Sequence, residues 1–185
     1  MNHAFFGNLA TRLKIVEASD WCPTAATDGR HFYYNQYFVK ALDDNELLFL
    51  VAHEVLHCVY DHMGTEVRQD RDPRLFNIAC DYNINMTIED NKIGRVITTV
   101  PILLDRKYFG KTSFEIYDEL YENAEKIDIN ELLDKMLDEH LEDEDGADGA
   151  GDGDEGEDGK KSSRVKLSKE EKKQIKDEVK NAVLQ

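Results

Sequence analysis

The sequence predicts an α+β fold that is mostly helical and contains one small β-hairpin. Three observations lead to this prediction. Most apolar residues recur at the three- and four-residue spacing of amphipathic helices. The dipeptide Asp28-Gly29, which favours a tight hairpin turn, lies between two short segments of the kind that form strands. Several helix starts carry a capping pattern, in which a polar residue precedes an acidic residue by three positions. With 185 residues, the chain suits one ordinary domain and an appended segment.

The first part of the chain is expected to supply scaffold and the hairpin. Apolar residues at helical spacing predict one amphipathic helix over residues 5–18. Residues 22–27 and 30–35 are the predicted strands, and residues 36–41 a short helix. An exposed strand edge can bind an extended peptide through backbone hydrogen bonds, and an ordinary structural hairpin explains the same pattern equally well.

The motif H-E-x-x-H, at His53, Glu54 and His57, follows an apolar run and predicts a metal-binding helix. Residues four apart lie one turn above each other on a helix, so the two imidazoles face a common point and Glu54 borders it. Two neutral imidazoles at this spacing suit zinc, and a neighbouring carboxylate can take a proton from zinc-bound water. A capping box before the apolar run places this helix over residues 43–63.

Two residues are candidates for a third metal ligand. His62 lies nine positions after His53, so on a continuous helix it points about 180° away and reaches the same metal only if the helix breaks. Asp81 is the preferred candidate. It lies in a predicted helix over residues 75–89 whose two sides are both largely apolar, and a buried carboxylate requires a partner. The alternative is that Asp81 binds Arg74 or main-chain amides.

Further polar residues are candidates for supporting the ligands or for stabilising an oxyanion. Asn77 and Asn85 lie one helical turn before and after Asp81, where they can hydrogen-bond to the ligands. One further histidine and two tyrosines, all close in sequence to the predicted ligands, are candidates for the oxyanion, and the sequence does not decide among them. These are His62, Tyr60 and Tyr82.

After these two helices the sequence predicts smaller elements. Four of the five residues 95–99 are β-branched, which predicts a short strand or an extended segment. Capping boxes at residues 112–115 and 128–131 each predict a helix, the first with Phe114 and Tyr121 among its inward-facing residues.

Composition divides the chain into three parts. Residues 1–141 form the predicted folded domain. Residues 142–163 consist of Asp, Glu, Gly, Ala, Lys and Ser, so they are predicted to be a disordered acidic linker. Residues 164–185 predict a basic amphipathic helix that is expected to continue in a longer protein.

Charge and composition also exclude several classes of partner. The net charge of −16 is a poor match for nucleic acid, and no apolar run is long enough to span a membrane. The N-terminus lacks the pattern of a secretory signal, and three widely spaced cysteines do not form a disulfide framework. We therefore expect a cytoplasmic protein with neither nucleic-acid nor membrane partners.

The motifs together resemble the VWA-associated metallopeptidase family of bacteria and phages. The likeness lies in Asp28-Gly29-Arg30, in the spacing from His53 to His62, and in the run from Asn77 to Asn85. It implies a zincin-like N-terminal domain, a linker and then a von Willebrand A-like domain, often with an AAA-type ATPase as partner. Residues 164–185 resemble a truncated lead-in to that second domain, which this sequence lacks. The resemblance marks six motif positions: His53, Glu54, His57, His62, Asp81 and Asn85.

The expected function is hydrolysis of peptide bonds in a peptide or protein substrate. Zn²⁺ would be the cofactor, held by His53, His57 and a third residue, and Glu54 would be the catalytic base. The alternative is a zinc-stabilised interaction module that cleaves nothing and works with a VWA domain or an AAA-type ATPase.

Overall fold

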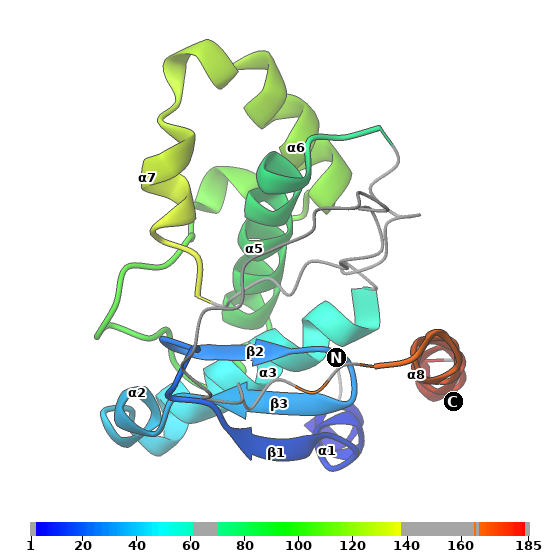
Figure 1. The fold of residues 1–185 in the computed structure, drawn as a ribbon. Coiled ribbons are helices and arrows are strands. Elements are labelled where there is room, and N and C mark those ends of the chain that lie inside the picture. The colour runs from blue at the N-terminus through cyan, green and yellow to red at the C-terminus, as the bar shows by residue number, and fades with distance from the viewer. Residues whose placement is uncertain (1–2, 61–69, 138–164, 166, 184–185) are drawn as a thin grey trace, which may run out of the picture.

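The computed structural model describes residues 3–60, 70–137, 165 and 167–183, and it shows an α+β fold. The strands are β1 (Lys14–Glu17), β2 (Ala25–Thr27) and β3 (His31–Tyr34). The helices are α1 (His3–Ala10), α2 (Gln36–Lys40), α3 (Asp44–Tyr60), α5 (Pro73–Asp90), α6 (Ser113–Glu122), α7 (Ile129–Leu133) and α8 (Lys169–Val183). Short 3-10 turns cover Arg106–Tyr108 and Ala124–Lys126. The predicted combination of many helices with a small sheet is confirmed (Figure 1).

The sheet has three strands in the order β1-β3-β2. The predicted hairpin is confirmed, because β2 pairs antiparallel with β3 and Gly29 adopts a φ of 84° in the turn. The predicted single helix over residues 5–18 is wrong. The chain leaves α1 after Ala10, and residues 14–17 form β1, parallel to β3. Pairing with β3 satisfies the main-chain hydrogen-bonding groups of residues 14–17. The β-branched side chains of Ile15 and Val16 also favour a strand.

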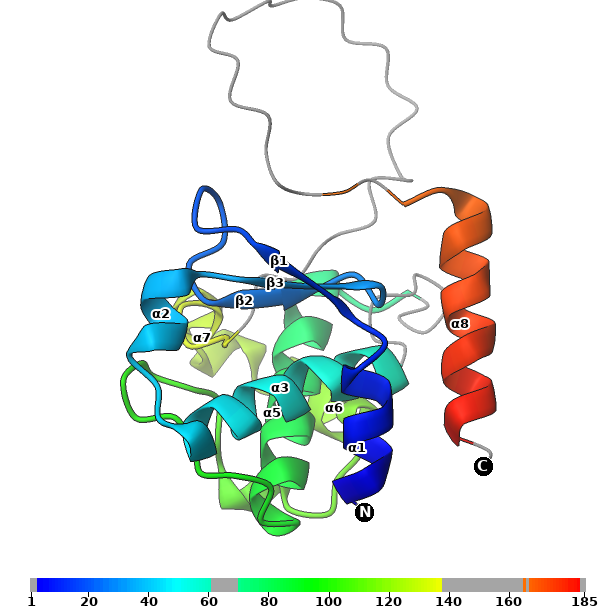
Figure 2. The same cartoon turned by 90° about the horizontal axis from the view of Figure 1, so that it is seen from below.

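Helix α3 covers one face of the sheet (Figures 1 and 2). Its apolar side chains meet those of the strands in a first core cluster, which includes Phe49 and Leu50 from α3 and Ala25 and Phe32 from the sheet. The capping box that begins α3 is present: the Asp43 N–H donates to Glu46, and the Glu46 N–H donates to Asp43. Helix α3 is thereby fixed in position at its start and along its apolar side.

The loop after α5 passes directly over the first turn of α3. Gly94 has a φ of 67°, and a Cβ atom there would lie 2.3 Å from the carbonyl oxygen of Asn45. Only glycine fits this approach. The next residues hold the loop in place, since the Thr98 N–H donates to a Glu46 carboxylate oxygen at 3.2 Å. Residues 95–99 belong to no strand, so of the two predicted alternatives the strand is wrong.

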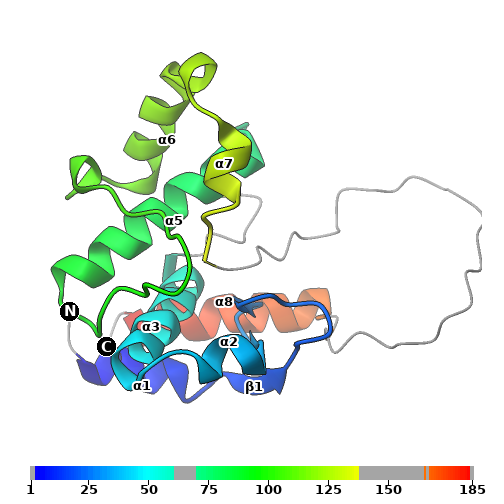
Figure 3. The same ribbon diagram turned by 90° about the vertical axis from the view of Figure 1, so that its left-hand side faces the viewer.

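Helix α5 lies between two groups of elements (Figure 3). One side of α5 contributes Ile84 and Ile88 to the first core cluster, beside α3. The other side contributes Ile78 and Met86 to a second core cluster with α6 and the residues that follow it. The predicted two-sided helix is confirmed, and it extends over Pro73–Asp90 with Asp72 as N-cap. Asp72 accepts a hydrogen bond from the Leu75 N–H at 2.9 Å, which satisfies one free amide of the first turn.

The later helices follow the predicted caps but differ in detail. The Thr112–Glu115 capping box begins α6, yet Phe114 and Tyr121 are 38% and 63% exposed, so the prediction that they face inward is wrong. Helix α8 begins at its predicted cap and packs beside α1 and α3 (Figure 2). The predicted linker, residues 142–163, lies outside the described residues. Among the described helices, none has the length and apolar character needed to cross a membrane.

Candidate metal centre

The structure brings His53, His57 and Asp81 together in the interior. One ligand atom from each residue lies within 4.8 Å of the others, and this is a group that could hold a metal ion. The two histidine Nε2 atoms are 3.0 Å apart, and His57 Nε2 lies 3.5 Å from Asp81 Oδ1. All three residues are at most 1% exposed. The preferred third candidate of the sequence analysis is therefore placed with the H-E-x-x-H histidines.

Helices α3 and α5 position these groups, because successive turns of one helix contact successive turns of the other. His53 contacts Asn85 on α5. One turn further along α3, His57 contacts Asp81, which lies one turn back along α5. A polar stripe of α5 therefore faces the histidine side of α3, because residues four apart share one side of a helix. Two local sequence patterns thus create a site that neither helix forms alone.

Asn85 fixes the orientation and the protonation of His53. The amide Nδ2 of Asn85 donates to the main-chain oxygen of Leu103 at 2.9 Å, which leaves its Oδ1 as an acceptor. His53 Nδ1 lies 2.8 Å from that oxygen and must donate its hydrogen to it. A neutral His53 then carries no hydrogen on Nε2, so its lone pair points at the centre of the group.

The donor set fits a divalent cation such as zinc. Two imidazole nitrogens that face each other at 3.0 Å need either a hydrogen or a cation between them. Asp81 adds a negative charge at the same point, and buried charges require a partner of opposite charge. Two histidines and one carboxylate, with a fourth position left over, form the kind of set that catalytic zinc sites use.

The other predicted site residues are found in different places. Glu54 is 0% exposed and lies in the turn of α3 between the two histidines. Asn77 is 5% exposed, and its Oδ1 accepts no hydrogen bond from any described residue. Tyr60 lies on the histidine side of α3, at its end. Tyr82 packs against the second core cluster, where its ring centroid lies 4.8 Å from that of Tyr108. His62 lies outside the described residues.

Two supporting residues were missed by sequence reasoning. Leu103 accepts the hydrogen bond from Asn85, and the Leu137 N–H donates to Asp81 Oδ2 at 3.3 Å. Both act through main-chain atoms, so their side chains give no sign of the role. Of the predicted alternative partners of Asp81, a main-chain amide is found, that of Leu137, whereas Arg74 donates to Asn130 instead.

If this group holds a metal ion, replacing Asn85 with alanine is expected to weaken metal binding by about 10- to 100-fold, the usual effect of removing a group that orients a metal-binding histidine. Competition with a chelator measures the affinity. Asn83→Ala is a matched control, because Asn83 is on the same helix and also donates to a main-chain oxygen, that of Lys111, but on the other side. Equal affinities for the two variants would contradict the proposed role of Asn85.

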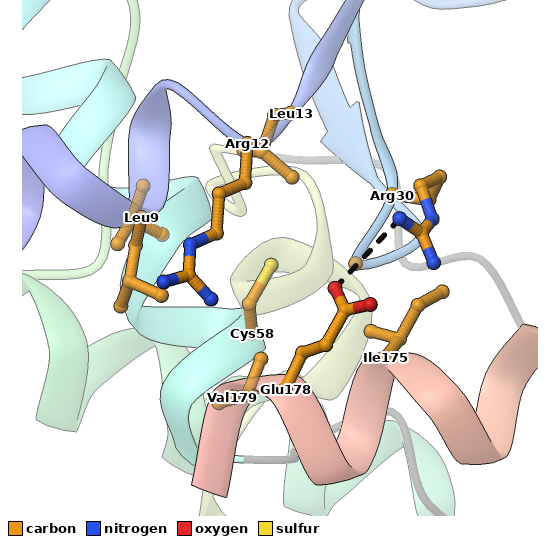
Figure 4. A pocket seen from close by; sticks show the side chains of 10 residues that line it. Leu9, Arg12, Leu13, Arg30, Cys58, Ile175, Glu178 and Val179 are labelled. Atoms are coloured by element: carbon orange, nitrogen blue, oxygen red, sulfur yellow. Dashed lines mark ion pairs between the residues drawn. The ribbon is translucent and has the colours of Figure 1, made fainter. Parts of the chain in front are cut away.

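A small cavity lies on the far side of α3 from the histidines, where α1, α3 and α8 meet (Figure 4). It holds about 20 Å³, enough for a single water molecule. Leu9 and Val179 line it, and Arg30 forms an ion pair with Glu178 at 3.7 Å across its rim. Cys58 projects into it, and desolvation by the surrounding protein raises the pKa of this thiol to about 12, opposed by a hydrogen bond with Thr27.

The alkylation rate of Cys58 should therefore keep rising with pH. Only the thiolate reacts, and a pKa of about 12 means that its fraction grows steadily through pH 10, whereas a free cysteine levels off near its pKa of about 8.5. Iodoacetamide labelling of the folded protein, followed by mass spectrometry of the Cys58 peptide, gives the profile. The same peptide in denaturant is the control, and a plateau near pH 9 in the folded protein would contradict the raised pKa.

The fold and the site define an α+β protein with a buried His-His-Asp group that could hold a metal ion. A family described as "Putative metallopeptidase domain" matches residues 1–185, and the chain belongs to this family. No curated protein and no solved structure matches the chain.

Proposed function

We propose that the protein is a zinc-dependent metallopeptidase that hydrolyses peptide bonds. The observation that carries the proposal is the buried group of His53, His57 and Asp81 with Glu54 in the adjoining turn. Membership of a family described as a metallopeptidase domain supports the same reaction class. Three protein ligands and a neighbouring carboxylate are what a hydrolytic zinc site requires.

In this proposal each residue has a definite task. His53 and His57 would hold the ion through their Nε2 atoms, which are 3.0 Å apart, and Asp81 would hold it through Oδ1, the oxygen that lies 3.5 Å from His57 Nε2. Asn85 holds the ring of His53 in the required orientation. When bound, zinc would lower the pKa of a water molecule and polarise the substrate carbonyl.

Glu54 moves the proton in the proposed reaction. Its carboxylate takes a proton from the attacking water and then gives it to the nitrogen of the leaving amine. Its complete burial excludes bulk water, which keeps this proton exchange between the carboxylate and the reacting groups. For the oxyanion we favour Tyr60 over Tyr82, because Tyr60 is on the histidine side of α3 and Tyr82 packs against the second core cluster.

Metal analysis and a cleavage assay on the same purified sample test the function. We expect about one zinc per chain and cleavage of a peptide library that stops on addition of a chelator and returns with zinc. Stoichiometric zinc without any cleavage would favour the alternative, a zinc-stabilised interaction module for a VWA-domain or AAA-type partner. A protein that takes up no zinc would contradict both.

A further inference from the structure

We propose that Leu137 is a positioning residue for the metal ligand Asp81, acting through its main-chain N–H. This inference rests on the proposed zinc site and names a residue that determines its affinity and geometry. The N–H of Leu137 donates to Asp81 Oδ2 at 3.3 Å. Leu137 is 56 positions away from Asp81 in the sequence, so the contact depends on the tertiary fold.

The two oxygens of Asp81 have different surroundings. Oδ2 accepts the hydrogen bond from Leu137, and Oδ1 lies 3.5 Å from His57 Nε2. A carboxylate whose second oxygen is bonded to an amide is held in one rotamer and presents a single oxygen to the metal. One oxygen from Asp81 and two histidine nitrogens would make up the three-ligand set that hydrolytic zinc sites use.

Leu137 is itself held firmly in place. Its side chain is 0% exposed and belongs to the first core cluster, whereas the preceding residue, Met136, packs against the second cluster. The chain therefore crosses from one core cluster to the other at this peptide. On its other side, the main-chain oxygen of Leu137 accepts a hydrogen bond from Thr24 Oγ1 at 2.5 Å. The hydrogen bond from Thr24 and the buried side chain thus hold in place the residue whose N–H faces Asp81.

Two variants of Leu137 distinguish the effect of its main-chain N–H on metal binding from the effect of its side chain. Leu137→Pro removes both the N–H and most of the side-chain packing, while Leu137→Ala removes packing but keeps the N–H. We expect the proline variant to bind zinc about 10- to 100-fold more weakly than the alanine variant. With Co²⁺ in place of zinc, the visible absorption spectrum should change in the proline variant only, because it reports the coordination geometry.

A second pair covers the case in which Leu137→Pro does not fold. Thr24→Val removes the hydroxyl that holds the Leu137 carbonyl, and Thr24→Ser retains it. The valine variant should show weaker zinc binding and an altered Co²⁺ spectrum, and the serine variant should match the wild type. Thr87→Val is the control for a lost hydroxyl, since Thr87 donates to a main-chain oxygen within α5.

The outcomes distinguish this inference from the proposed function. If the wild type binds zinc but both members of each pair match in affinity and in Co²⁺ spectrum, Leu137 has no positioning role, and the zinc site stands. If the wild type binds no zinc or cobalt, the proposed function and this inference fail together. A change confined to thermal stability, with affinity and spectrum unchanged, would show a purely structural role and overturn the inference.

Discussion

Glu54→Gln is expected to lower peptide hydrolysis by about 10² to 10⁴-fold while the zinc content stays at the wild-type level. Glutamine has the size of glutamate but cannot accept the proton of the attacking water. Glu54 is not among the three residues whose ligand atoms converge, so the metal should remain bound. Steady-state rates on a cleaved peptide, with metal analysis of the same sample, measure both quantities.

A second glutamate, on α5, serves as a control for the loss of a carboxylate in the Glu54 experiment. Glu89→Gln removes a carboxylate that pairs with Arg106 on the surface, at 2.7 Å, and should leave the rate unchanged. Cleavage at the wild-type rate by Glu54→Gln would overturn the role of Glu54 as base. Loss of zinc along with the rate would show instead that Glu54 takes part in holding the ion.

Zinc is expected to raise the melting temperature of the metal-free protein by about 8–16 °C. Free zinc at a thousandfold excess over its dissociation constant stabilises a protein by about 4 kcal/mol, and each kcal/mol shifts the midpoint by about 2–4 °C at this chain length. The physical reason is the close contact between two histidine nitrogens and a carboxylate, which a cation relieves. Thermal melts with and without zinc measure the shift.

Asp81→Asn should remove most of this zinc-dependent shift, because the charge that binds the ion is lost. Asp90→Asn is the matched control, since Asp90 is exposed at the end of the same helix. Comparing each variant with and without zinc separates metal binding from any change in the stability of the metal-free protein. A full zinc shift in Asp81→Asn would show that Asp81 is not a ligand.

The central part of the site could be predicted because its signals are local. The spacing of His53 and His57 fixes their common face on one helix, whatever surrounds it. Asp81 could be singled out because α5 is apolar on both sides and so has no exposed face for a carboxylate; both core clusters do cover this helix. Such inferences need only helix periodicity and the cost of burying charge.

The features that escaped prediction depend on distant partners. The apolar spacing of residues 14–17 is compatible with a helix or a strand, and hydrogen bonding to β3 stabilises the strand. Leu103 and Leu137 support the site through main-chain groups that every residue type except proline shares, so no sequence pattern reveals them. The exposed rings of Phe114 and Tyr121 show that spacing alone does not determine which side of a short helix is buried.

The contacts around Asp81 also bear on when the site can assemble during synthesis. The H-E-x-x-H helix can form as soon as its own residues leave the ribosome, because its hydrogen bonds are local. The amide that holds Asp81 belongs to Leu137, so the complete support of that carboxylate requires synthesis to continue to that residue. Because domains emerge from their N-terminal end first, the histidines are made well before this support exists. We therefore expect nascent chains that end before Leu137 to bind zinc weakly, and the stable metal centre to be a late product of folding.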